Sequence, residues 1–142
     1  MSAYDENYIE DSTELNCLVF EEIARCQDVN FEHFVEGYMS SGYRKLMDKG
    51  STRLINMTFD EYLTYLRRDC PELFIIGNKE HEMDVLQAGW IGAMYNRLQF
   101  HLCISSEKIY ERLNLRTMMS YFITLHTIDE TLALRRIMDQ MN

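Results

Sequence analysis

The sequence has little of what interrupts a helix or holds a chain in a membrane. It contains one proline, Pro71, and six glycines among its 142 residues. Proline and glycine form turns and disfavour helix interiors, so their scarcity favours helical segments. No uninterrupted apolar run approaches the roughly 18 residues of a membrane-spanning helix. The sequence therefore predicts no membrane span.

Signals for secretion and for zinc binding are also missing. The N-terminus has no basic stretch followed by an apolar core, so we predict no secretory signal and expect the chain in the cytoplasm. The four cysteines are widely spaced, and none belongs to a C-x-x-C pair: Cys17, Cys26, Cys70 and Cys103. In a chain without a secretory signal, such cysteines indicate buried free thiols rather than disulfides or a zinc site.

The common catalytic motifs are absent. The chain has no G-x-S-x-G, no P-loop and no G-x-G-x-x-G, so nucleophilic, phosphoryl-transfer and dinucleotide chemistry have no motif support. The stretch Glu80-His81-Glu82, followed by Asp84, contains groups that bind metals. Carboxylates at the start of a helix are more simply explained by the positive end of the helix dipole. We therefore expect no metal site and no cofactor.

Basic residues are missing from the first 24 positions, and Arg25 is the first. From Met1 to Glu36 there are ten acidic residues and one basic residue, whereas residues 37–142 contain thirteen of each. The whole net charge of −9 therefore lies in the first quarter of the chain. Such a surface repels phosphate, which argues against nucleic acid and anionic membranes as partners. It favours a basic protein partner.

The N-terminus is predicted to be a flexible acidic leader over residues 1–11, followed by a single helical domain over residues 12–142. Its acidic residues alternate with apolar ones, and tyrosine is a typical interface anchor. In this interpretation the carboxylates steer the chain to a basic surface and the apolar residues bury there. The predicted partner-binding residues are Tyr4, Asp5, Glu6, Tyr8, Ile9, Glu10 and Asp11. The alternative is a solvating tail without a partner.

Hydrophobic periodicity predicts an all-α fold. Apolar residues recur every three or four positions from Phe31 to Met47, which is typical of an amphipathic helix; a break at Ser40-Ser41-Gly42 is the alternative. Thr58 with Glu61, and Thr127 with Glu130, have the spacing of capping boxes. The longest apolar pattern runs over about residues 80–104. We therefore expect an irregular bundle of about six to seven helices around a central helix near residues 80–104.

One pair of residues suggests an enzyme. Arg97 and His101 lie one helical turn apart, and the pair resembles the arginine and histidine of the HEPN ribonucleases, which are small helical proteins. The resemblance implies metal-independent RNA cleavage, with His101 as base and Arg97 on the phosphate. The spacing is shorter than is usual in that family, and the polar residue Asn96 precedes the arginine instead of following it. The alternative is a half-buried helix face without catalytic function.

Several stretches of the chain are distinctive when taken together: residues 38–50 (YMSSGYRKLMDKG), 89–95 (GWIGAMY), 105–110 (SSEKIY), Tyr121 and 125–127 (LHT). They resemble small bacterial proteins of unassigned function that are encoded beside toxin-like genes, as in toxin–antitoxin pairs. These motifs are mostly core aromatics and caps, so no catalytic residue carries over. The resemblance implies a protein that binds another protein, with a toxin as one such partner. Its many Met and Tyr residues leave self-association as a further alternative.

Overall fold

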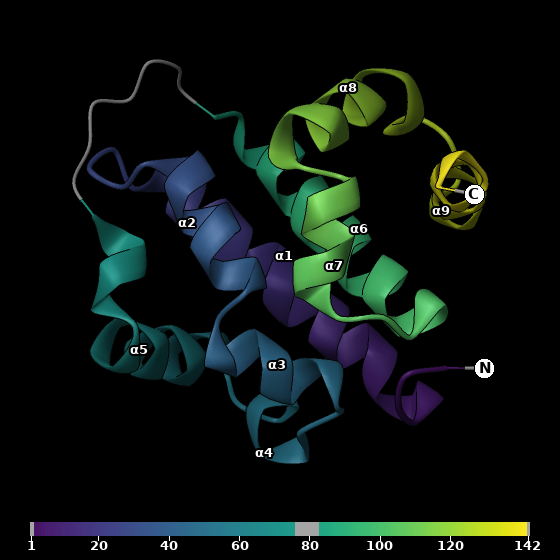
Figure 1. The fold of residues 1–142 in the computed structure, drawn as a ribbon. Helices are drawn as coiled ribbons and strands as arrows, with labels where there is room; N and C mark the ends of the chain where they lie inside the picture. Colours follow the sequence, from purple (N-terminus) through teal and green to yellow (C-terminus); the bar gives the residue numbers. More distant parts are fainter. Residues whose placement is uncertain (1, 76–82, 142) are drawn as a thin grey trace.

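A computed structural model describes residues 2–75 and 83–141, and within these ranges the chain is 77% helical and has no strand. Figure 1 shows the helices packed into an irregular bundle. In chain order they are η1 (Glu6–Tyr8), α1 (Ile9–Arg25), α2 (Phe31–Met39), α3 (Gly42–Asp48), α4 (Thr52–Ile55), α5 (Phe59–Asp69), η2 (Pro71–Phe74), α6 (Val85–Leu102), α7 (Ser106–Arg112), α8 (Leu115–Leu125) and α9 (Glu130–Gln140). The predicted all-α class is confirmed.

The helices are shorter and more numerous than predicted, and the segment after Asn30 shows why. Its apolar stripe is divided between α2 and α3, as in the alternative with a break at residues 40–42. The Ser41 side chain accepts a hydrogen bond from the backbone N–H of Arg44 and so caps α3. A serine that caps a new helix competes with continuation of the old one. The described ranges therefore contain nine α-helices instead of six or seven.

One of the two predicted capping boxes is confirmed. The capping box of Thr58 and Glu61 is formed at the start of α5. The box predicted for Thr127 and Glu130 is wrong, because α9 begins at Glu130 and its N-cap residue is Asp129. The longest helix, α6, begins at Val85 with Asp84 as its cap. Residues 80–82, which contain possible metal-binding groups and the predicted start of this helix, lie outside the described residues.

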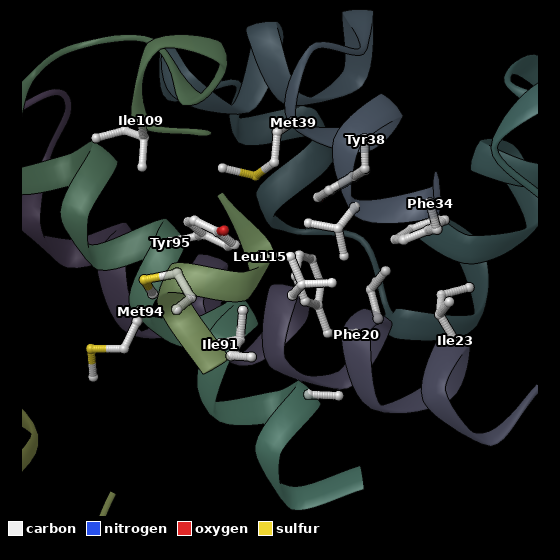
Figure 2. Close-up of a cluster of buried hydrophobic side chains, with 14 of the residues drawn as sticks. Phe20, Ile23, Phe34, Tyr38, Met39, Ile91, Met94, Tyr95, Ile109 and Leu115 are labelled. Carbon is white, nitrogen blue, oxygen red and sulfur yellow. The ribbon is translucent and has the colours of Figure 1, made fainter. Parts of the chain in front are cut away.

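Helices α1 and α6 lie side by side through most of their length (Figure 1). Gly92 makes this approach possible: a Cβ atom there would lie 2.7 Å from the Asn16 carbonyl oxygen and 2.7 Å from Cγ of Phe20. Phe20 in turn meets Tyr38 of α2 and Tyr95 of α6, with ring centroids 5.9 and 6.4 Å away. Figure 2 shows these residues within one apolar cluster. The hydrophobic core is therefore built around the contact between α1 and α6.

A buried polar network crosses the same region. The Arg44 side chain, which is almost fully buried, donates from Nε to Asp48 Oδ1 at 3.0 Å and from Nη2 to Asn96 Oδ1 at 2.7 Å. Asp48 also accepts from the backbone N–H of Ser106, the first residue of α7, at 2.8 Å. Asn16 accepts from the Tyr38 hydroxyl at 2.7 Å. A buried ion pair is tolerated only when both charged groups keep hydrogen-bond partners. The network supplies these partners to Arg44 and Asp48, and it connects α1, α2, α3, α6 and α7.

The N-terminal segment folds onto this body. The backbone N–H of Ala3 donates to the Phe100 carbonyl at 2.9 Å, and the Tyr4 hydroxyl lies 2.7 Å from Ser12 Oγ. The Tyr4 ring packs edge-on against Phe100 with centroids 4.9 Å apart. Because α1 begins at Ile9, the boundary predicted at residue 12 falls inside a helix. The structure thus differs from a leader that is separate from the helical domain.

Replacing Gly92 by alanine tests the close approach of α1 to α6. We expect Gly92→Ala to lower the free energy of unfolding by about 1–3 kcal/mol, because the added methyl group meets backbone and a packed ring. The matched control is Gly42→Ala, since a Cβ at Gly42 meets nothing within 4 Å. Urea denaturation measures both. Equal stability of Gly92→Ala and the wild type would contradict the tight contact.

Candidate functional site

The acidic residues of the N-terminus gather on the first two turns of α1 and the residues just before it. Asp5 accepts from the backbone N–H of Asn7 at 2.9 Å and caps η1. Glu6, Glu10, Asp11 and Glu14 are exposed. Among the described residues, neither Asp11 nor Glu14 has an ion-pair partner. These carboxylates therefore leave uncompensated negative charge at one end of the bundle.

Asp11 and Glu14 border a groove that we call the acidic groove. It has a volume of about 350 Å³ and lies between α1 and the α4–α5 connection. Its lining residues are Asp11, Glu14, Leu15, Leu18, Ile55, Asn56, Met57 and Phe59. The four from α1 have the spacing i, i+3, i+4, i+7, so they form one face of that helix. The groove combines two carboxylates with apolar side chains, and none of its lining residues in the described ranges is basic.

The far wall of the acidic groove is held by the capping box of α5. Met57 and Phe59 flank Thr58, whose side chain accepts from the backbone N–H of Glu61 at 3.2 Å. The Glu61 carboxylate accepts in return from the Thr58 backbone N–H at 3.2 Å. Ile55 is buried at the end of α4, whereas Met57 and Phe59 are half-buried. The capping box therefore fixes the turn that presents the two half-buried side chains.

The residues predicted as partner anchors have internal contacts. Tyr4 is engaged with Ser12 and Phe100, as described above, and Tyr8 packs against the core cluster. Of the seven residues predicted from the sequence, Asp11 is the one that lines the acidic groove. Sequence reasoning missed Glu14, Leu18, Met57 and Phe59. The signal in the sequence is the spacing of Asp11, Glu14 and Leu18, which places them on one face of α1.

Arg97 and His101 lie in a second groove, of about 430 Å³, which we call the arginine groove. It is formed by α1, α6 and α9, and it also includes Glu10 and Glu130. Arg97 Nε donates to Glu130 Oε1 at 2.9 Å, and Arg97 Nη2 donates to the Glu10 carboxylate at 3.2 Å. The predicted catalytic pair and the predicted partner-binding residue Glu10 are thus brought together. Their contacts attach α1 and α9 to α6.

The electrostatics of the arginine groove are poor for phosphate. Two carboxylates already contact the Arg97 guanidinium, so a phosphate would have to displace them. Partial burial, with a smaller contribution from Arg97, lowers the pKa of His101 below its ordinary value of 6.5. Asn96, the polar residue beside the pair, points into the buried network and donates to Ser12 Oγ at 2.9 Å. The groove therefore resembles a structural salt-bridge cluster more than a site for RNA.

A third cleft, of about 370 Å³, adjoins the acidic groove and shares Asn56 and Met57 with it. Its other lining residues are Tyr43, Arg53, Glu61, Tyr65 and Arg68. Arg68 pairs in bidentate fashion with Asp69, with N–O distances of 2.8 and 3.1 Å. Hydrogen bonds from Arg68 and Tyr43 lower the pKa of Asp69 to about 2. The charge of Arg68 is thus matched locally, and Arg53 is the cation at this cleft without an ion pair in the described chain.

Two further observations concern ligands and membranes. In the described parts of the chain, no group of three or more His, Cys, Asp or Glu side chains is placed to hold a metal ion. None of the helices there is long and apolar enough to cross a membrane.

Comparison of the chain with protein-family models, with curated proteins and with solved structures gave no match.

The lowered pKa of His101 predicts a pH dependence of stability. Because the unfolded chain binds this proton more readily, stability falls as the pH drops from above 6.5 towards the pKa of the folded protein. We expect acidification from about pH 7.5 to about pH 5.5 to cost the wild type more unfolding free energy than the His101→Gln variant. Urea denaturation of both proteins at the two pH values measures the difference. Equal losses of unfolding free energy in the two proteins would show that the pKa of His101 is not lowered in the folded state.

Proposed function

We propose that this protein binds another protein and covers a basic surface of that partner. The observation that carries the proposal is the set of exposed carboxylates at the start of α1, two of which border a groove that half-buried apolar side chains also line. Negative charge beside half-buried apolar side chains matches an interface that attracts a basic partner and then excludes water. The resemblance to proteins encoded beside toxin-like genes supports a toxin as the partner, in the cytoplasm.

The mechanism of such a protein is steering followed by occlusion. Uncompensated carboxylates raise the rate of encounter with a cationic surface, and this effect weakens with salt. Once docked, the body of the bundle prevents substrates from reaching the covered surface. Glu10 pairs with Arg97 and Asp5 caps η1, so the steering role falls to Glu6, Asp11 and Glu14. Tyr4 and Tyr8 are occupied by internal contacts and do not serve as anchors. Residues 3–8 are already placed against the body, so docking needs little further ordering of them.

A ribonuclease remains the second candidate, because Arg97 and His101 share one groove. The two carboxylates on Arg97 and the acidic surface nearby both oppose RNA binding. The partner-binding proposal needs no displacement of existing ion pairs at Asp11 or Glu14. It is therefore the better supported of the two.

Capture from the native cell extract tests the proposed function. Immobilised wild-type protein is expected to retain a basic protein. A variant with Glu6→Lys, Asp11→Lys and Glu14→Lys is expected to lose at least about nine-tenths of it, because like charges then face each other. Mass spectrometry identifies the retained protein, and stopped-flow mixing with the purified partner measures the association rate. An association rate unchanged in the variant would refute the steering role.

Incubation with RNA tests the second candidate. We expect wild-type protein and the His101→Ala variant to leave RNA intact to the same extent, because Arg97 is held by Glu10 and Glu130. Gel electrophoresis of the RNA over time is the measurement. Cleavage by the wild type that disappears in His101→Ala would overturn the partner-binding proposal in favour of an enzyme.

A further inference from the structure

We infer that the acidic groove receives a basic amphipathic helix of the partner, with leucine-like side chains against Leu18, Met57 and Phe59 and lysine or arginine side chains against Asp11 and Glu14. This inference rests on the proposed function and names its docking site. It differs from the sequence-based expectation, in which Tyr4, Tyr8 and Ile9 were the anchors.

The shape of the groove supports a helical occupant. Two walls face each other across it: one face of α1, and the connection from Ile55 to Phe59. A volume of about 350 Å³ accommodates a few large apolar side chains rather than a folded domain. An amphipathic helix places such side chains at i, i+3, i+4 and i+7 on one face and is often recognised by a groove of this kind. The half-buried Leu18, Met57 and Phe59 supply the complementary apolar surface.

The charges around the groove select a basic helix and fix its orientation. Asp11 and Glu14 stand on the α1 side without ion-pair partners in the described chain. Arg53 lies beyond Asn56 and Met57, in the neighbouring cleft. Lysine or arginine side chains of the occupant therefore belong on the α1 side, away from Arg53. This pattern disfavours a second copy of the chain, whose N-terminal quarter carries the same negative charge.

The test uses a defined probe, because the partner is unidentified. The probe is a fluorescent peptide of about 18 residues made of leucine and lysine, with leucines at i, i+3, i+4 and i+7. Two control peptides have the same length: one replaces lysine by glutamate, and the other has the same composition with the leucine periodicity scrambled. Fluorescence anisotropy measures the affinity for the full chain. NMR chemical-shift changes in the ¹⁵N-labelled protein locate the bound peptide.

Matched variants separate the groove from general electrostatics. Asp11→Lys with Glu14→Lys, and Glu107→Lys with Glu111→Lys, change the net charge equally. Each pair includes one residue in the first turn of its helix. We expect the first pair to weaken peptide binding at least about tenfold and the second pair less than about twofold. Leu18→Gln with Met57→Gln is expected to weaken it at least about fivefold. Thermal unfolding checks the folding of each variant, and Asp11→Asn with Glu14→Gln replaces the first pair if it does not fold.

The outcomes distinguish the docking site from the proposed function. Equal weakening by the two charge-reversal pairs, or equal affinity for the scrambled peptide, would overturn the groove as a docking site. If that occurs while capture of a basic protein still depends on Glu6, Asp11 and Glu14, the proposed function stands and only the site is lost. If the peptide binds the groove as expected but the cell extract yields no basic partner, the groove stands and the proposed function fails.

Discussion

The close contact between α1 and α6 is the constraint on which the rest of the structure depends. Gly92 lets the Asn16 carbonyl and the Phe20 ring come close to α6, because even a methyl group at this position would lie 2.7 Å from each of them. This contact turns Asn16 toward Asn96 and Tyr38, so the buried polar network can form around Arg44. Helices that pack this tightly have few alternative arrangements. The orientation of α1 about its own axis is therefore fixed.

The fixed orientation of α1 determines which of its side chains line each groove on the surface. With Asn16 and Phe20 against α6, Glu10 faces Arg97 and α9, whereas Asp11, Glu14 and Leu18 face the α4–α5 connection. One short acidic stretch thus supplies two different surfaces. The first is an ion-pair cluster that fastens α9 to the body. The second keeps its carboxylates free of ion pairs within the described residues, and this difference makes it the better candidate for a partner.

Local signals in the sequence predicted much of the fold. The period of apolar residues and the capping box of Thr58 and Glu61 identified the helical class and the start of α5. The sequence could not show that Arg44 is buried, because its partners Asn96 and Ser106 are distant in the chain. The internal contacts of Tyr4 with Ser12 and Phe100 were missed for the same reason. The candidate groove needed the tertiary structure, since Met57 and Phe59 meet α1 only after folding.

The most direct test of the account is photo-crosslinking in the native cell. A photoreactive amino acid is placed at Asn56, an exposed residue of the acidic groove, and in a second strain at Ile123, which is 73% exposed on α8. The account predicts that Asn56 forms an adduct with a lysine- or arginine-rich segment of one protein, whereas Ile123 does not. An adduct with that protein from Ile123 alone, with none from Asn56, would contradict it.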